Sequence, residues 1–165
     1  MFFKSNLVKS LIEDHEEIRH QYEILKDSKR EYSEKRLAFG YLMPLLKSHT
    51  EREERVVYHF MKNQSVDLAH YALEGKEEHR IADRIAGELQ NSQLAKDNWL
   101  AKAKVLGELL DHHINEEERL VFPDLNKVLN EELDEQMSLE YKKLFSPSLA
   151  ENDIDDLKDN QVNPI

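Results

Sequence analysis

The sequence predicts an all-α protein, an up-down-up-down antiparallel four-helix bundle with a short C-terminal helix and a disordered tail. Apolar residues recur every three or four positions over four long stretches, which is the helical period. Short segments of turn and capping residues separate these stretches, and short connections favour antiparallel neighbours. Only four Gly and four Pro are present and 35 % of the residues are charged. Strands, which favour β-branched runs and need turn residues between them, are therefore disfavoured.

The apolar periodicity places the first helix at residues 6–30 and the second at 34–62, with a break at Ser33. The third helix is expected at 66–91 and the fourth at 97–130, after breaks at 63–65 and 91–97. Pro44 lies inside the second stretch and should bend it, because a prolyl ring crowds the residue four positions earlier. That residue is Gly40, which has no side chain, so one bent helix is predicted.

A further short helix is expected at about 131–145. We predict a four-helix-bundle domain over residues 1–145 and a separate tail over 146–165. The tail is acidic and too polar to pack, so disorder is expected there.

Composition excludes several classes of function. The formal net charge of −11 at pH 7 argues against nucleic acid as a partner, since phosphates require an excess of Lys and Arg. The same charge disfavours anionic membranes. No cysteine is present, which excludes disulfides and thiolate ligands. The first residues lack the apolar run of a signal peptide and no stretch is long and apolar enough to span a bilayer, so a cytoplasmic location is expected.

Ionisable residues interrupt the apolar stripes of all four predicted helices. Each follows the stripe at a spacing of three or four residues and should therefore face the bundle interior. An unpaired polar group there costs a few kcal/mol, so a binding partner is required. The six residues are His15, His49, Glu53, His79, His113 and Glu117.

The four histidines are predicted to lie at one height in the bundle. Successive histidines are separated by 34, 30 and 34 residues, and the midpoints fall near residues 32, 64 and 96, inside the expected turns. Residues equidistant from a turn are level in an antiparallel bundle. Each of the two glutamates follows a histidine by four residues and lies on nearly the same face.

A shift of 64 residues superposes the two halves of the sequence, with His15 on His79, His49 on His113, and Glu53 on Glu117. This repeat gives each of two metal ions two imidazoles and leaves the glutamates free to bridge. Imidazole and carboxylate ligands without thiolate suit iron, manganese or zinc. Two carboxylates offset only part of the charge of two ions, so oxo or hydroxo bridges are expected.

Polar residues other than these six have their own interpretations. Glu54 or Glu118 could replace its neighbour as a ligand, because a helix kink shifts the inward-facing residue. Tyr22 is read as a core residue with a possible part in supporting the ligands. The remaining histidines lie off the ligand face and are predicted to be surface residues; they are His20, His59, His70 and His112.

The motifs resemble those of the hemerythrin, or HHE cation-binding, family over residues 1 to about 130. They are Asp14-His15, His49-x-x-x-Glu53-Glu54, Glu78-His79, and His113-x-x-x-Glu117-Glu118 before Phe122-Pro123. The resemblance implies a non-haem centre of two iron ions that binds dioxygen reversibly, or that senses oxygen or iron.

The chain departs from the oxygen-carrying members of that family at Gly75, where they have a fifth histidine. The repeat-equivalent position is Leu11, so the centre should resemble the more symmetric, four-histidine members. One iron could then keep an open coordination position. A second departure, His59 in place of a frequent proline, is expected to lie outside the site.

The function expected first is binding of dioxygen or another small diatomic ligand, for storage, scavenging or sensing, by two iron ions in a dry pocket. Its predicted lining is Leu11, Ile18, Leu45, Val56, Leu110 and Ile114. The alternatives are a di-iron oxidoreductase acting on peroxide or nitric oxide, and an iron or redox sensor whose bundle is ordered by metal. No catalytic residue and no protein partner is predicted, and a binding protein is favoured over an enzyme.

Overall fold

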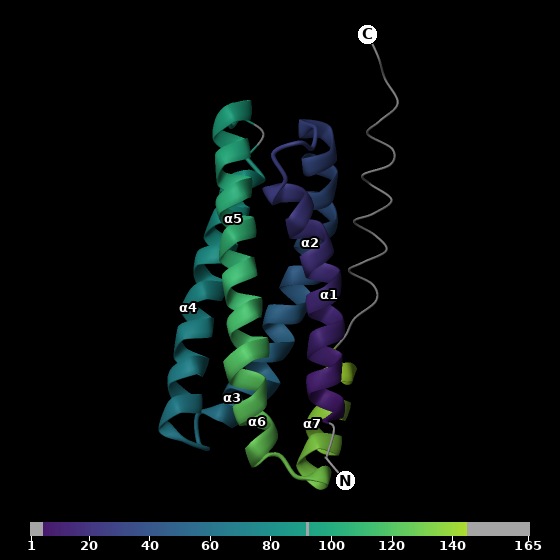
Figure 1. Cartoon of the computed structure of the whole chain (residues 1–165), viewed down its shortest axis with the longest axis vertical. Coiled ribbons are helices and arrows are strands. Elements are labelled where there is room, and N and C mark those ends of the chain that lie inside the picture. The colour runs from purple at the N-terminus through teal and green to yellow at the C-terminus, as the bar shows by residue number, and fades with distance from the viewer. Residues whose placement is uncertain (1–4, 92, 145–165) are drawn as a thin grey trace.

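The computed structural model describes residues 5–91 and 93–144, and within them every regular element is a helix (Figure 1). The first two of the four long antiparallel rods are α1 (Asn6–Lys26) and α2 (Tyr32–Arg52), the latter continued by η1 (Glu53–Tyr58) and α3 (His59–Met61). The third is α4 (Val66–Leu89). The fourth is α5 (Lys96–Glu116), continued by η2 (Glu117–Val121) and α6 (Phe122–Val128). The predicted helical bundle is confirmed.

Local side-chain bonds explain where α1, α2 and α4 begin. The hydroxyls of Ser5 and Ser65 accept from the amides three residues on, which satisfies a donor that the first helical turn leaves free. Glu31 caps α2 in a capping box with Glu34, so the expected break at Ser33 is displaced and Ser33 lies in the first turn.

The first helix ends four residues earlier than expected, at Lys26. Asp27 leaves the helical conformation, with φ −66° and ψ 112°, and its carboxylate accepts from the amide of Lys29 at 2.8 Å. Such a side-chain bond mimics a backbone turn and competes with the helix.

The second helix continues through Pro44, as predicted for a single helix. The helices α2 and α5, which carry His49 and His113, each pass into a π-helical segment. These segments begin at the repeat-equivalent residues Glu53 and Glu117. A π turn holds an extra residue, so the buried stripe moves along the chain by about one position. Val121, rather than the expected Leu120, is consequently buried.

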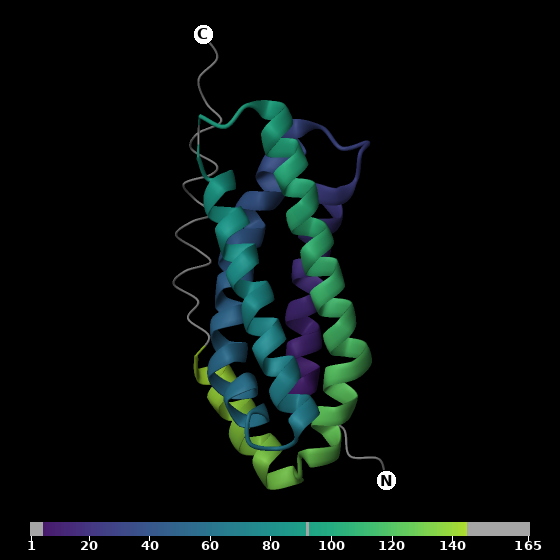
Figure 2. The same cartoon turned by 90° about the vertical axis from the view of Figure 1, so that its left-hand side faces the viewer.

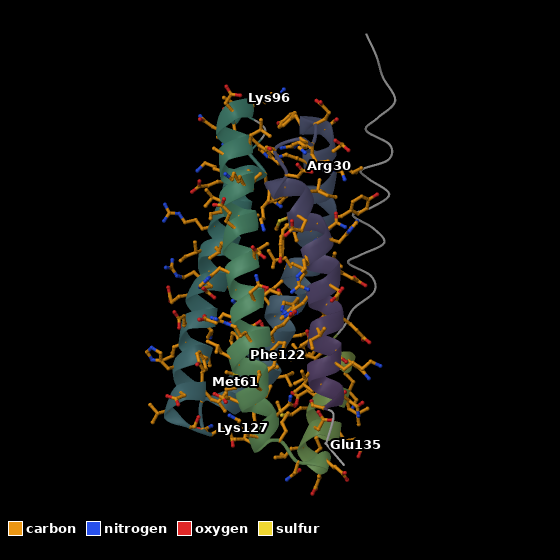
Figure 3. All side chains as sticks on the ribbon, viewed as in Figure 1. Arg30, Met61, Lys96, Phe122, Lys127 and Glu135 are labelled. Carbon is orange, nitrogen blue, oxygen red and sulfur yellow. The ribbon has the colours of Figure 1, made fainter. Side chains whose placement is uncertain are left out.

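Two apolar clusters fill the bundle, one on each side of the histidine layer. One cluster includes Leu11 and Val57, and the other includes Ile18 and Trp99. His15 lies between Leu11 and Ile18 on α1, so the polar layer is enclosed along the bundle axis. Figure 3 labels Arg30 and Lys96 at one end of the bundle, and Phe122 farther along it toward Lys127 and Glu135 at the other end.

The last described helix, α7 (Glu131–Lys143), corresponds to the short helix expected at 131–145. It turns back and packs against α1 and η1 at the end of the bundle where α1 begins (Figure 2). The tail predicted over 146–165 lies outside the described residues, and the division into 1–145 and 146–165 stays a prediction. None of the described helices has the length and apolar character needed to cross a membrane.

Candidate metal centre

The structure brings all six predicted ligand residues into one buried layer. Their exposed fractions are 4 % or less. Ligand atoms of His15, His49, Glu53 and Glu117 lie within 4.8 Å of one another, and so do those of Glu53, His79 and His113. The histidines therefore form two pairs that share a glutamate. This is the arrangement that the 64-residue repeat predicts.

Each glutamate lies between the two histidine pairs. Oε2 of Glu53 is 3.5 Å from Nε2 of His49 in one pair and 3.4 Å from Nε2 of His79 in the other. Oε2 of Glu117 is 3.3 Å from Nε2 of His15 and 3.4 Å from Nε2 of His113. One carboxylate from each ligand helix can thus reach both halves of the layer.

The imidazole rings repeat the same geometry in both halves. The centroids of His15 and His49 are 4.9 Å apart with the ring planes at 70°, and those of His79 and His113 are 4.8 Å apart at 67°. An aromatic ring stacks on one histidine of each pair, Phe122 on His15 and its repeat counterpart Tyr58 on His79. Each aromatic ring thus packs on the face of one imidazole in its pair.

Each of the four histidines in the layer also has a carboxylate on its outer nitrogen, Nδ1. Nδ1 of His15 is 3.0 Å from Glu118, and Nδ1 of His79 is 3.0 Å from Glu54. These two carboxylates therefore lie behind the imidazoles, on the side away from the layer. Glu54 and Glu118 thus do not take the inward positions of Glu53 and Glu117.

The remaining two histidines follow the same rule with acids from α1 and α4. Nδ1 of His49 is 3.3 Å from Asp14, and Nδ1 of His113 is 2.6 Å from Glu78. A carboxylate on Nδ1 fixes that nitrogen as the donor and leaves Nε2 as the metal-facing atom. All four Nε2 atoms consequently point into the layer.

Sequence reasoning missed the common role of these four carboxylates behind the imidazoles. The signal that could have found them is adjacency, because each acid is the chain neighbour of a predicted ligand: Asp14 of His15, Glu54 of Glu53, Glu78 of His79, and Glu118 of Glu117. Neighbours on a helix point about 100° apart, so the acid of one helix reaches behind the imidazole of the next helix.

The carboxylates of the layer raise the pKa of His49 and of His79. Burial by itself lowers the pKa of His49, but attraction to Glu53 and the bond with Asp14 outweigh it and raise the pKa to about 10. The pKa of His79 rises to about 9 against burial, through Glu53 and Glu54. The pKa of Glu53 is held well below its usual value, since the neighbouring His49 and His79 overcome the effect of burial. The metal-free layer therefore attracts positive charge strongly.

Within the described part of the chain, several buried atoms in the layer have no hydrogen-bond partner. They are Nε2 of His15 and of His49, both carboxylate oxygens of Glu53, and Oε2 of Glu117. Buried polar atoms are nearly always satisfied, so such a group of orphans at one point needs an explanation. Imidazole nitrogens and carboxylate oxygens are the ligands that iron, manganese and zinc share. The buried cluster fits a metal site.

The space beside Gly75 is filled by a tyrosine. A Cβ at position 75 would stand 2.7 Å from Cζ of Tyr58, closer than real contacts allow. The Tyr58 hydroxyl donates to Oε1 of Glu117 at 2.7 Å, and the residue is 1 % exposed. Burial and the neighbouring Glu117 raise the pKa of this phenol well above its usual value, so it stays a donor. The sequence predicts that Gly75 could leave one iron with an open coordination position, and the structure places the Tyr58 hydroxyl, a hydrogen-bond donor, beside Gly75.

The other sequence predictions around the layer can be compared directly. The four off-face histidines are exposed, as predicted. Of the six residues proposed to line a dry pocket, five are buried and Leu45 is half-buried against the core. Tyr22 is fully buried and donates to Asp111 at 3.0 Å, away from the six ligand residues.

The hemerythrin HHE cation-binding domain matches residues 6–125, which include every residue of the layer and all four outer carboxylates. The comparison with curated proteins found no match. The matched range covers most of the chain and ends before α7. With its buried His and Glu cluster, the chain belongs to the hemerythrin HHE cation-binding family.

Proposed function

We propose that the chain holds two non-haem iron ions through His15, His49, Glu53, His79, His113 and Glu117, and that these ions bind dioxygen. The observation that carries the proposal is the convergence of four Nε2 atoms and two carboxylates in one buried layer, with five atoms left without a partner. Manganese and zinc satisfy the same ligands and are the alternatives.

The proposed division of ligands follows the two histidine pairs. His15 and His49 would hold one ion, and His79 and His113 would hold the other. Glu53 and Glu117 could serve both ions, because Oε2 of each lies between the pairs. Iron supplies the electrons and the coordination positions that dioxygen needs.

The protein's own contribution is to exclude water, orient the imidazoles and balance charge. The layer is closed by apolar clusters on both sides, which keeps the site dry. The two bridging and four outer carboxylates are accompanied by three cationic side chains: Arg19 on Glu118, Arg52 on Asp14, and Lys76 on Glu54. The excess of negative charge favours a pair of cations over an apolar ligand.

The test is metal analysis and optical spectroscopy of protein purified without air. We expect about two iron ions per chain, and a ligand-to-iron absorption band that appears with dioxygen and disappears when dioxygen is removed. The Glu53→Ala variant should lose iron, while His20→Ala, which changes an exposed histidine, should keep it. Iron that is oxidised irreversibly without a reversible band rejects oxygen binding and leaves the metal centre standing.

The same preparation separates the alternative functions. Turnover of peroxide or nitric oxide that Glu53→Ala abolishes would identify an oxidoreductase. A sensor requires a structural change on metal loading. The cytoplasmic location stays a prediction.

A further inference from the structure

The C-terminal helix α7 reaches the outer side of the histidine layer. The hydroxyl of Tyr141, a fully buried residue, is 3.1 Å from Nδ1 of His49 and donates to Oδ2 of Asp14. Arg52 donates to the same oxygen at 2.8 Å, and its guanidinium lies 4.3 Å from the centroid of the Tyr141 ring. The acid that orients His49 is therefore shared with a residue of α7.

The other end of α7 is bonded to the start of α1. The carboxylate of Asp134 accepts from the backbone amides of Asn6 at 2.8 Å and Leu7 at 3.1 Å, and also from the hydroxyl of Ser5. A carboxylate in this position satisfies free amides of the first turn and complements the helix dipole. Asp134 and Tyr141 are seven residues apart, two helical turns, so both face the bundle.

Apolar contacts join these two polar anchors. Met137, between Asp134 and Tyr141 on the same face, packs in the buried cluster that contains Val57 of η1. The η1 segment carries Glu53, one of the two proposed bridging carboxylates. Docking of α7 thus covers the segment that positions Glu53 and supplies a hydrogen bond behind His49.

Only one half of the centre has this support. The repeat counterpart of His49 is His113, whose Nδ1 faces Glu78. In the described part of the chain no tyrosine hydroxyl bonds to His113, and the position equivalent to Arg52 is Glu116. The two halves therefore differ in the side chains that hold the outer acid, Asp14 in one half and Glu78 in the other. The arrangement of the two histidine pairs is nearly the same.

We propose that Tyr141 is a positioning residue for His49, and that metal binding between His15 and His49 stabilises the docking of α7 on the bundle. This inference rests on the metal centre proposed above. With α7 docked, Asp14 and His49 are held in the ligand geometry; with α7 detached, Asp14 is solvated and the imidazole loses part of its support. The two states then differ in metal affinity, and linkage requires metal to favour the docked state by the same factor.

The experiment measures amide hydrogen exchange of the full chain by mass spectrometry, without metal and with zinc(II), a probe that does not change oxidation state. Amides of α7 should exchange about 10–100-fold more slowly with zinc, the range by which supporting partners change metal affinity. In Tyr141→Phe this slowing should shrink, and zinc affinity at one of two positions should fall by about the same factor. Tyr22→Phe removes a buried hydroxyl bonded to Asp111 and serves as the matched control, with wild-type behaviour expected.

A second variant separates docking from hydrogen bonding. Met137→Ala removes packing from α7 and touches no polar group of the centre, and we expect it also to weaken zinc binding at one position. Unchanged exchange of α7 on zinc loading, with slower exchange in α2 and α5, overturns the coupling and leaves the metal centre intact. Absence of zinc binding and of any protection overturns both.

Discussion

The ring of Tyr58 occupies the space that a side chain at Gly75 would need. Tyr58 stacks on His79 at a centroid distance of 5.5 Å and donates to Glu117 at 2.7 Å, so its position is set by two residues of the proposed centre. Position 75 faces the layer one helical turn before His79. The glycine and the tyrosine are thus one structural unit, formed by α4 and η1.

Adding a side chain at position 75 should destabilise the metal-free protein. The Cβ of Gly75→Ala would meet Tyr58 in a filled core, and overpacking of this kind costs about 1–3 kcal/mol. Urea unfolding measures the loss. In Gly87→Ala nothing lies within 4 Å of the new Cβ, so this control on the same helix should gain about 0.5–1 kcal/mol.

The coupling between the two residues can be tested in a double-mutant cycle. Tyr58→Phe removes the hydroxyl, which is the atom closest to a Cβ at position 75, so Gly75→Ala should cost less in that background. Additive costs would show that the two positions do not interact.

The outer carboxylates should set metal affinity without binding metal. We expect Glu54→Gln and Glu118→Gln each to weaken zinc binding by about 10–100-fold, because each removes the anion behind one imidazole. Their effects should be similar, since the repeat makes them equivalent. Competition with a chelator gives the affinities. Glu51→Gln, on the exposed face of α2, is the control, and equal losses in all three variants would argue for a general charge effect.

The melting temperature of the metal-free protein should fall as pH rises from about 6.5 to 9.5. Folded His49 and His79 have pKa values of about 10 and about 9, above the roughly 6.5 of an unfolded histidine. Their contribution to stability is fully present below pH 6.5 and is lost as pH rises through the folded values. Circular dichroism melts across this range measure the effect, and His49→Gln should reduce the slope.

Bound metal should reverse this pH dependence. Metal keeps the histidines neutral in the folded state, so their contribution is present above about pH 6.5 and is lost as pH falls below it. The gain in melting temperature on zinc loading should therefore grow between pH 6 and 9. A gain that is constant or shrinks over this interval would show that zinc does not displace protons from these histidines.

The amino-acid sequence determined the helices and the content of the inner layer. Apolar spacing decides which face of a helix is buried, and equal distances from the turns decide the level of a residue along the bundle. The sequence positions of His15, His49, His79 and His113 therefore determine both their burial and their common level. The repeat then placed the two glutamates between the pairs. The π segments could not be foreseen, because no local signal in the sequence distinguishes them from α-helix.

Only the tertiary structure decided what stands behind the inner layer. The rotation and separation of helices distant in sequence decide three features. They decide which acid reaches which imidazole, how Tyr58 fills the space at Gly75, and where α7 docks. Spacing along one helix contains no information on those quantities. They follow from the packing of two apolar clusters around a polar layer, in which every side chain has to fill the space its neighbours leave.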